Sequence, residues 1–461
     1  MEAFDAVVIG AGPAGLVAGA ILSSERKRTL VCEKSPWIGG RAMAVDVDGF
    51  KLNLGGHLLE DSGSGITAIF KHLGVELRHG SVSSSLPVFR DGRWGQVQEM
   101  YRGKKEELKK IISILGQMDY SEFDRLDDVA MRPWLMQHTS SEEVIALFEY
   151  LAVLECMTEE WYDHSASDNL FVRKLHYGEK KMAGYSFWPE AGWDGIFGIL
   201  KEVILKNHGQ VRLNTPVHRV VIRKGQVEGV VVSEGEPSVP GELLERKLIQ
   251  TENVVCTLPV WNVLEVVSSN DLPGWYAEQI RYLAQEKFKV CWLGYYVASR
   301  EPIFAMEPKE MCTWLSAPKS GLGGFAFLNS ALDPNVAPPG AHLWVCGATF
   351  LGTRPREWVD RKIKDFDEDL RVMFPALEGK AVMWRRRHLV GSPPFGLVQK
   401  PTLVGTYRPA PSVPNVKGLF FASDTFRSRG VGVDRAARAG LTAAELVLGK
   451  RVDGLEGTWR Y

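Results

Sequence analysis

The chain has 461 residues, 45% of them hydrophobic and 24% charged, so it is long enough for two or three domains of ordinary globular composition. Its formal net charge of −1 lacks the basic excess of nucleic-acid-binding proteins, which excludes that class. Six scattered cysteines form no C-x-x-C pair and no Cys/His cluster with metal-ligand spacing, which predicts buried free thiols in a reducing cytoplasm and no metal site.

The N-terminus predicts a strand, a glycine-rich turn and an apolar helix. Residues 6–9 lead into Gly10-Ala11-Gly12-Pro13-Ala14-Gly15, a G-x-G-x-x-G pattern. Gly10 permits a tight turn, Gly12 lets a pyrophosphate approach the backbone, and Gly15 lets the helix pack against the sheet. The helix N-terminus, at Pro13 and Ala14, offers unpaired N–H groups to the anion.

A second predicted strand, residues 29–32, ends in Glu33, which lies 18 residues beyond Gly15. A carboxylate at this distance is suited to bind the diol of a nucleotide ribose. Lys34 follows, and the chain then reads Gly39-Gly40-Arg41, where the glycines let the backbone pass close to a ligand and Arg41 can pair with a phosphate. Together the two strands and their loops predict a dinucleotide site.

The first segment closes with a turn and a helix. Residues 48–57 end in Gly55-Gly56-His57, and a helix predicted at 66–73 stops at Gly74 in the C′ position. His57 is either a polar group beside a ligand or a turn histidine satisfied by its neighbours. We assign residues 1–78 to the first part of a nucleotide-binding domain.

Residues 79–186 predict a mostly helical segment on the substrate side. Apolar residues repeat at helical spacing over 101–117 and over 142–155, and a capping box precedes the second helix. The lysines of the first helix could contact an anionic membrane surface or form a solvated face, and the solvated face is favoured.

Residues 187–285 return to the nucleotide-binding domain. A helix ends near residue 209, and the alternation of strands 217–222 and 227–232 predicts a hairpin that begins at Val217. Residues 233–252 are polar and turn-rich and predict an exposed excursion. An apolar strand at 254–258 closes this part of the domain.

Residues 286–411 predict a mixed sheet that forms the floor of a substrate cavity. The expected elements are strands at 288–297, 324–328, 342–350 and 381–388 and one helix at 359–373. Lys289 and Lys287 flank the first strand, as ligand-facing or as solvated lysines. Arg385-Arg386-Arg387 is expected to alternate between the two faces of the last strand, and a role in binding an anionic substrate is the less favoured interpretation.

Residues 412–461 carry a second nucleotide signal. A strand at 418–423 ends in Asp424, and Gly430-Val431-Gly432-Val433-Asp434 opens an apolar helix over 436–448. A second helix N-terminus, at Gly432 and Val433, can therefore point at the ligand. We assign these residues to the third part of the nucleotide-binding domain.

These paired motifs resemble the FAD-binding segments of the flavin amine oxidase and phytoene desaturase superfamily. The resemblance implies an α/β fold with a Rossmann-like FAD-binding domain and a discontinuous α+β substrate domain. It also implies that Glu33 binds the adenosine ribose, that Arg41 lies near the pyrophosphate, and that the backbone of Val217 faces the adenine. The Gly-Gly-His ending is more similar to the phytoene-desaturase branch.

The resemblance has further implications for the flavin end of the cofactor. It places the turn of Gly55, Gly56 and His57 near the isoalloxazine, Asp424 near the ribityl and pyrophosphate groups, and the helix start at Gly432 beside the flavin ring. Amine-oxidase relatives hold a water beside the flavin with a lysine near such a strand start, so Lys289 and His57 are the catalytic candidates. Because no cysteine lies beyond residue 346, covalent attachment through a C-terminal cysteine is not expected.

Three functions remain open. The first, favoured by His57 and Asp424, is an FAD-dependent dehydrogenase, desaturase or isomerase acting on a C–C bond of a small apolar or cyclic molecule. The second is a flavin amine oxidase acting on a C–N bond. The third is a non-catalytic relative similar to the Rab GDP-dissociation inhibitors, against which the intact FAD-binding residues argue.

Overall fold

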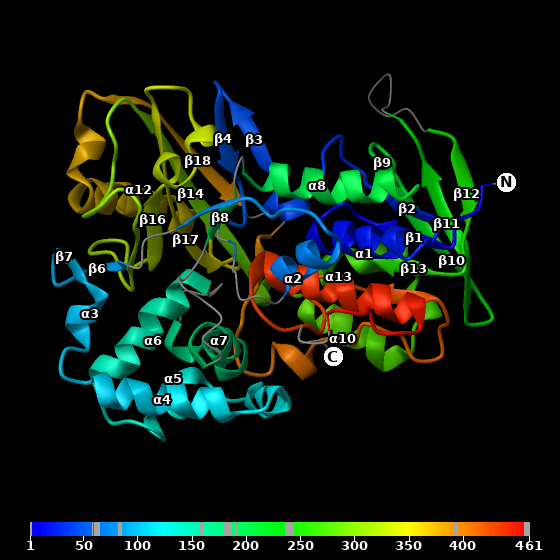
Figure 1. Ribbon diagram of the computed structural model, residues 1–461, viewed down its shortest axis with the longest axis horizontal. Coiled ribbons are helices and arrows are strands. Elements are labelled where there is room, and N and C mark those ends of the chain that lie inside the picture. Colours follow the sequence, from blue (N-terminus) through cyan, green and yellow to red (C-terminus); the bar gives the residue numbers. More distant parts are fainter. Residues whose placement is uncertain are drawn as a thin grey trace.

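The computed structural model describes residues 2–57, 59, 65–81, 85–155, 161–178, 187–189, 192–235, 244–390 and 394–455. Figure 1 shows a nucleotide-binding domain on the right, a second sheet with helix α12 at the upper left, and a group of helices at the lower left. The α/β class and the Rossmann-like arrangement predicted from the sequence are confirmed.

A five-stranded parallel sheet forms the centre of the nucleotide-binding domain. Its order is β20–β13–β1–β2–β9, so strands from both ends and from the middle of the chain lie side by side. The bounds are β1 (Ala6–Ile9), β2 (Thr29–Cys32), β9 (Gln210–Arg212), β13 (Val254–Cys256) and β20 (Leu419–Phe421). Every residue of β1, β2 and β13 is buried, which explains their continuous apolar sequences.

Helices cover one face of this sheet, and a small antiparallel sheet with two further helices covers the other. Side chains alternate along β1, so Val8 joins the core of the helical layer and Val7 joins the opposite core. The helical layer comprises α1 (Pro13–Ser24), α2 (Ile66–His72), α8 (Gly192–Lys206) and α13 (Gly432–Leu448). The opposite layer comprises β10 (Val217–Arg223), β11 (Gln226–Ser233), β12 (Arg246–Gln250), α9 (Val260–Val266) and α10 (Gly274–Leu283).

Strand β12 lies inside residues 233–252, where the sequence predicted only an exposed excursion, so that prediction was incomplete. The strand pairs antiparallel with β11, from Gly229 opposite Gln250 to Ser233 opposite Arg246. Among its five residues only Ile249 is buried. A single buried position gives no alternation that a sequence pattern could reveal.

A mixed sheet forms the second domain, as predicted, in the order β18–β14–β17–β16–β15–β6–β7. Helix α12 (Arg356–Met373) packs against the face that carries Leu293, Tyr295 and Val297. The strands are β6 (Pro87–Arg90), β7 (Arg93–Gln96), β14 (Lys289–Ser299), β15 (Met311–Trp314), β16 (Gly324–Leu328), β17 (His342–Leu351) and β18 (Val382–Val390), and β19 (Gly396–Leu397) pairs with β14 off this path. α11 (Asn329–Leu332) connects β16 to β17.

The β6–β7 hairpin comes from residues 79–186, which were expected to be mostly helical. It enters the sheet through a parallel bridge between Val88 and Thr313. Its turn residues Asp91 and Gly92 both have positive φ, 53° and 77°. Asp-Gly between short strands is a strong hairpin signal that the sequence analysis did not use.

Helices make up most of the remainder of this segment: α3 (Val97–Met100), α4 (Lys105–Gln117), α5 (Met131–Met136), α6 (Glu142–Glu155) and α7 (Ala166–Arg173). α6 has the predicted bounds, whereas α4 begins later than predicted because Gly103 turns the chain with φ 84°. Lys109 is ion-paired with Glu106, which agrees with a solvated face. Two small pairings complete the fold, β3 (Ala44–Val47) with β4 (Phe50–Asn53) and β5 (His79–Ser81) with β8 (Phe187–Pro189).

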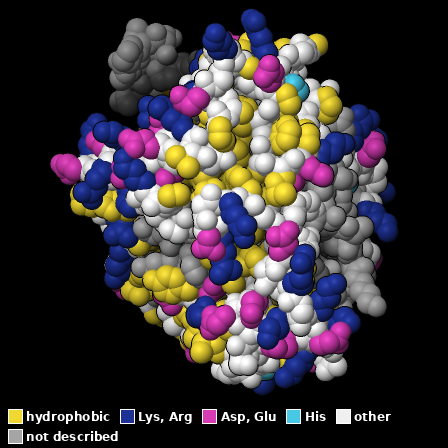
Figure 2. All heavy atoms as spheres, turned by 90° about the vertical axis from the view of Figure 1, so that its left-hand side faces the viewer, with side chains coloured by type: hydrophobic (Ala, Val, Ile, Leu, Met, Phe, Trp, Pro, Cys, Tyr) yellow, Lys and Arg dark blue, Asp and Glu magenta, His cyan; other side chains and the backbone are white. Residues whose placement is uncertain are grey.

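Figure 2 shows the face that carries α12 and β7. Hydrophobic side chains gather in its upper middle, and charged side chains of both signs surround them. This mixture agrees with the small net charge of the chain. Within the described ranges, none of the helices combines the length and the apolar character needed to cross a membrane.

Candidate cofactor site

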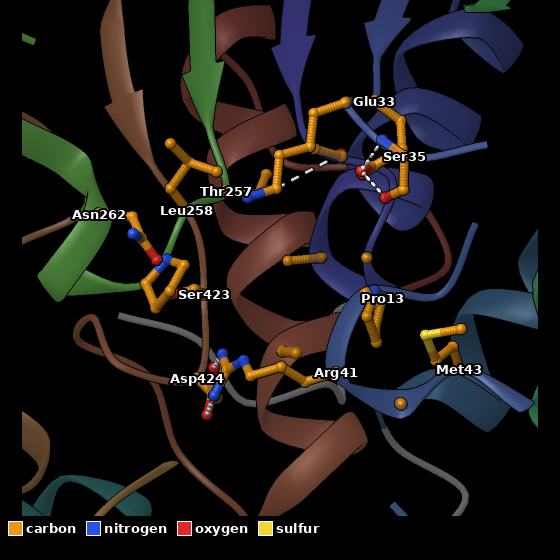
Figure 3. Close-up of a pocket in the computed structure, with 18 of the residues that line it drawn as sticks. Pro13, Glu33, Ser35, Arg41, Met43, Thr257, Leu258, Asn262, Ser423 and Asp424 are labelled. Atoms are coloured by element: carbon orange, nitrogen blue, oxygen red, sulfur yellow. Dashed lines mark hydrogen bonds and ion pairs between the residues drawn. The ribbon is translucent and has the colours of Figure 1, made fainter. Parts of the chain in front are cut away.

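A cavity of about 520 Å³ opens at the carboxyl ends of the parallel strands, within the size range of ligand pockets. Most of the predicted cofactor residues line it, although they come from all three parts of the nucleotide-binding domain. They are Gly10, Gly12, Pro13, Ala14, Glu33, Lys34, Gly40, Arg41, Gly56, Val217, Asp424, Gly432 and Val433. Figure 3 shows Glu33 and Ser35 at one end of the view and Arg41 and Asp424 at the other.

The glycine-rich turn has the shape that the sequence predicted. Gly10 adopts a φ of +100°, and a Cβ there would lie 2.7 Å from the Thr257 Oγ1, which donates to the Ile9 carbonyl. Gly12 is the N-cap of α1 without any side-chain cap, and it faces Gly40 closely enough that a Cβ on Gly40 would lie 3.3 Å from its Cα. The uncapped start of α1 therefore borders the cavity with no side chain in the way.

The Glu33 carboxylate is buried and firmly oriented. It accepts hydrogen bonds from the Ala11 N–H at 2.8 Å, the Ser35 N–H at 2.9 Å and the Ser35 hydroxyl at 2.5 Å. These bonds join the end of β2 to the glycine-rich turn. A carboxylate has about four acceptor positions, so Glu33 keeps capacity for a ligand hydroxyl.

Arg41 and Asp424, 383 residues apart, form an ion pair at the cavity wall. The Arg41 Nη1 donates to the Asp424 Oδ2 at 3.1 Å and to the Phe395 carbonyl at 2.9 Å, and the Nη2 donates to the Asp424 Oδ1. The Trp261 ring centroid lies 5.2 Å from the guanidinium carbon, a cation–π contact. The ion pair with Asp424 therefore fixes the orientation of the Arg41 guanidinium at the cavity wall.

The start of α13 is the second helix N-terminus at the cavity. Its N-cap, Val431, provides no side-chain hydrogen bond, and Gly432 adopts a φ of +50°. Gly432, Val433 and Ala436 line the cavity. Two uncapped helix starts and Arg41 make this wall suited to a pyrophosphate, while Glu33 suits a ribose, so the residues present fit FAD.

Two predicted glycines shape the loops without lining the cavity. A Cβ on Gly15 would lie 1.9 Å from the Gly10 carbonyl oxygen, and a Cβ on Gly55 would lie 1.8 Å from the Arg41 carbonyl oxygen. Both positions require glycine because backbone passes against backbone. Gly56 of the same turn lines the cavity, and the place of this turn beside the isoalloxazine stays a prediction.

The two catalytic candidates lie outside the residues that line the cavity. His57 is 5% exposed, and burial lowers its pKa to about 3, so its imidazole is neutral near pH 7. Its ring centroid lies 5.1 Å from that of Trp292 and 5.8 Å from that of Phe327. Lys289 is ion-paired with Glu286, and the Lys287 ammonium lies 4.8 Å from the Phe288 ring centroid.

The sequence analysis missed several residues that line the cavity, namely Thr257, Trp261, Asn262, Glu265, His388 and Phe395. α9 carries three of them and has only seven residues, too few for a helical pattern to be evident. His388 is half-buried, and burial lowers its pKa. The alternation of side chains along β18 was the sequence pattern that included His388, but only the preceding arginines were interpreted from it.

Two of those arginines, Arg385 and Arg386, form ordinary ion pairs. Arg385 donates to the Leu377 carbonyl and lies 3.5 Å from Glu378, and Arg386 pairs with Asp48 at 2.8 Å. Their charges are therefore used within the fold, and the anionic-substrate interpretation gains no support.

The prediction of buried free thiols covers six cysteines, of which Cys156 lies outside the described residues. Cys32, Cys256, Cys291, Cys312 and Cys346 are buried free thiols. In the portion of the chain that is described, no group of His, Cys, Asp or Glu residues has the arrangement of a metal site.

The parallel sheet, the two uncapped helix starts and the buried Glu33 carboxylate beside the cavity are the features of a dinucleotide-binding protein. The chain belongs to the family of flavin-containing amine oxidoreductases, whose model matches residues 13–448. FAD is accordingly the cofactor.

Curated relatives include two different chemistries. The putrescine oxidase of Kocuria rosea is 28% identical over 273 residues, which cover 55% of this chain and 56% of the relative. A 4,4′-diapophytoene desaturase of Methylomonas sp is 24% identical over 264 residues, 50% of each chain. The chain thus matches about half the length of these relatives.

Among solved structures, an oxidoreductase from Methanosarcina mazei superposes with a TM-score of 0.73 at 18% identity. The match covers 95% of this chain and 99% of that structure. At this identity the likeness concerns the fold alone.

Proposed function

We propose that this protein is an FAD-dependent dehydrogenase that oxidises a small apolar molecule at a C–C bond and passes the electrons to an acceptor other than oxygen. The observation that carries the proposal is an aromatic cluster next to the cavity, consisting of His57, Trp292, Phe325, Phe327 and Phe395. Phe395 lines the cavity, and Trp292 stacks on it with ring centroids 5.7 Å apart.

The cluster is closely packed against the sheet. The Trp292 indole lies across Gly347 of β17, where a Cβ would come within 1.9 Å of the ring. Phe325 and Phe327, on β16, stack with centroids 5.8 Å apart. Trp292 and Phe327 are buried behind Phe395, so this packing keeps water from the wall that Phe395 presents to the cavity and favours contact with an apolar substrate.

We assign the cofactor-binding roles as follows. Glu33 accepts hydrogen bonds from the adenosine ribose, Arg41 and the helix starts hold the pyrophosphate, and Val217 lies beside the adenine. FAD, when bound there, supplies the two-electron redox chemistry. His57 packs within the aromatic cluster. Because its imidazole is neutral near pH 7, it does not act as an imidazolium acid.

The position of Lys289 supports an acceptor other than oxygen. A cation beside the flavin would assist electron transfer to oxygen, where negative charge develops. Lys289 is paired with Glu286 and is not among the residues that line the cavity. The lysine is therefore proposed to have a structural role at the start of β14.

Amine oxidation is the second candidate function, and His388 favours it. Its imidazole lines the cavity, and burial lowers its pKa, so it is available to accept a proton from a substrate ammonium. The putrescine oxidase relative adds to this support. The non-catalytic alternative is disfavoured, because a protein without FAD has no use for Glu33 and Arg41 in these positions.

Anaerobic bleaching of the flavin absorbance distinguishes the two functions. Purified protein is mixed with three panels of compounds, namely amines, cyclic ketones and polyenes. The proposal expects bleaching by a compound of the ketone or polyene panel and none by the amines. Bleaching by amines alone would contradict the proposal and favour amine oxidation as the function.

A further inference from the structure

A cluster of buried charges lies between the helical segment and the start of α13. We call it the Asp168 cluster, and it consists of Asp127, Asp168, Arg429 and Arg435. Each of these residues is at most 2% exposed. None of them lines the cavity, so the cluster is separate from the cofactor wall described above.

Asp168, on α7, makes the contacts that reach α13. Its Oδ1 accepts from the Gly430 N–H at 3.3 Å and lies 3.7 Å from the Arg429 Nη1. Its Oδ2 accepts from the Arg435 Nη2, and Gln399 accepts from the same nitrogen at 3.0 Å. One carboxylate thus binds both the loop before α13 and the first turn of the helix.

Arg429 is held from the other side of the cluster. Its guanidinium donates to both oxygens of Asp127, at 2.6 and 3.0 Å, and to Asp124 at 2.6 Å. Asp127 also accepts from the Thr406 N–H at 2.7 Å. The loop that leads into α13 is therefore tied to residues about 300 positions earlier in the chain.

The electrostatics explain why an acid is needed here. Arg435 places a cation in the first turn of α13, where the helix dipole is itself positive. A buried cation costs several kcal/mol unless it is paired. The pKa of Arg408 reflects the local positive charge. Burial and the Arg435 charge lower this pKa to about 9, and the Asp168 charge opposes the shift.

Inside the loop, the Arg435 Nε donates to the Gly430 carbonyl at 2.6 Å, so this restraint depends on the same arginine that Asp168 pairs with. Gly430 and Gly432 adopt φ values of +97° and +50°, a region that glycine enters freely, and Val431 offers no side-chain cap. Gly432, Val433 and Ala436 of the same loop and turn line the cavity. A change in the cluster is therefore transmitted directly to the cofactor wall.

We infer that Asp168 is a positioning residue for the cofactor: it holds the α13 N-terminus against the FAD cavity and balances the Arg435 charge next to the flavin. The helical segment thereby sets both the affinity for FAD and the reduction potential of the bound flavin. The inference concerns the cofactor and does not depend on which substrate is oxidised.

Asp168→Asn tests the inference, since it preserves shape and removes charge. We expect the dissociation constant of FAD to rise at least tenfold, measured by titrating apoprotein with FAD. We also expect the midpoint potential of the bound flavin to become more positive, because an unbalanced cation favours the more negative reduced form. The double variant Asp168→Asn/Arg435→Gln should return the potential to the wild-type value.

Asp369→Asn is the matched control. Asp369 is buried like Asp168, with 2% of its surface exposed. It accepts hydrogen bonds from two backbone N–H groups, those of Lys319 at 2.7 Å and Ser320 at 2.8 Å, but it lies in the other domain. This variant should lower the Tm and leave FAD affinity and potential unchanged.

Arg435→Gln gives an independent reading if Asp168→Asn does not fold. It should move the potential in the opposite direction, to a more negative value, because Asp168 then outweighs the remaining cation nearby. If the flavin potential is unchanged in every one of the two single variants that can be purified, the inference is overturned. The same conclusion would follow if Asp168→Asn matched Asp369→Asn and lowered only the Tm.

Discussion

The two ends of the cofactor cavity are built in different ways. At the nucleotide end, residues 10–33 supply the turn, the helix start and the Glu33 carboxylate, and Glu33 closes the unit by binding the Ala11 N–H. At the proposed substrate end, Phe395 lines the cavity and joins an aromatic cluster with His57 and Trp292, and these three residues come from segments up to 338 residues apart. A local unit can be recognised by its spacing, whereas an assembled one depends on how whole sheets pack.

The first prediction tests the local unit at Gly15, where there is no room for a side chain. Gly15→Ala places a Cβ 1.9 Å from the Gly10 carbonyl oxygen, so the turn must move, and we expect a loss of about 3 kcal/mol in the free energy of unfolding together with loss of bound FAD. Gly198→Ala is the control, because nothing lies within 4 Å of a Cβ there and alanine favours the helix. Thermal unfolding and flavin absorbance measure both variants, and equal behaviour would contradict the close packing of the turn.

The second prediction concerns the ligand-facing part of the same unit. Glu33→Ala removes charge-assisted hydrogen bonds worth about 1.5–3 kcal/mol each, so FAD should bind more than tenfold more weakly while the fold is retained. Ser35→Ala removes one of the donors that orient the carboxylate and should have a smaller effect. Unchanged FAD affinity in Glu33→Ala would show that another group binds the ribose.

The third prediction tests the substrate end through pH. The His57 pKa falls from 6.5 in the unfolded chain to about 3 in the fold, so between these values the unfolded state binds more protons and stability falls with falling pH. At pH 5 the share due to His57 is about 2 kcal/mol. His57→Phe should therefore lose less stability than wild type between pH 7 and pH 5 in urea unfolding.

A histidine on the surface provides the comparison for this pH experiment. His208 is exposed and adopts a φ of +62°, which asparagine also tolerates. His208→Asn should keep the wild-type dependence on pH. If His57→Phe keeps it as well, His57 is not held neutral by the aromatic cluster.

The smallest effect is expected at Lys289. With its ammonium paired to Glu286, Lys289→Met should change the rate at which oxygen reoxidises the photoreduced protein less than twofold. Stopped-flow absorbance compares wild type, Lys289→Met and Lys287→Met without a known substrate. Fast reoxidation in wild type that slows at least tenfold in one of the variants would favour the oxidase function instead.

The same contrast explains what the sequence could and could not predict. The sequence sufficed to predict Glu33 and the glycine-rich turn, because the chain between them is short and each residue type has a local reason. The ion pair between Arg41 and Asp424 was not predicted, since their contact depends on β20 lying in the same sheet as β1. The roles of these residues in binding FAD stay predictions.

Residues at the substrate end lacked such a signal. His388 reaches the cavity because β18 pairs with β14 in a register that sets His388 opposite Gly294. A shift of one residue would turn His388 to the other face, so the alternation along β18 does not by itself place His388 at the cavity. The position of Trp261 likewise follows from the packing of α9, and that of Phe395 from its N–H donating to the Val290 carbonyl at 2.8 Å.

Release of the cofactor tests the central claim most directly. The purified protein should be yellow, and acid precipitation should release about one FAD per chain into the supernatant, since no cysteine follows residue 346 and we propose that Glu33, Arg41 and two helix starts hold FAD without a covalent bond. A colourless protein that FAD cannot reconstitute, or flavin that stays in the pellet, would contradict the account.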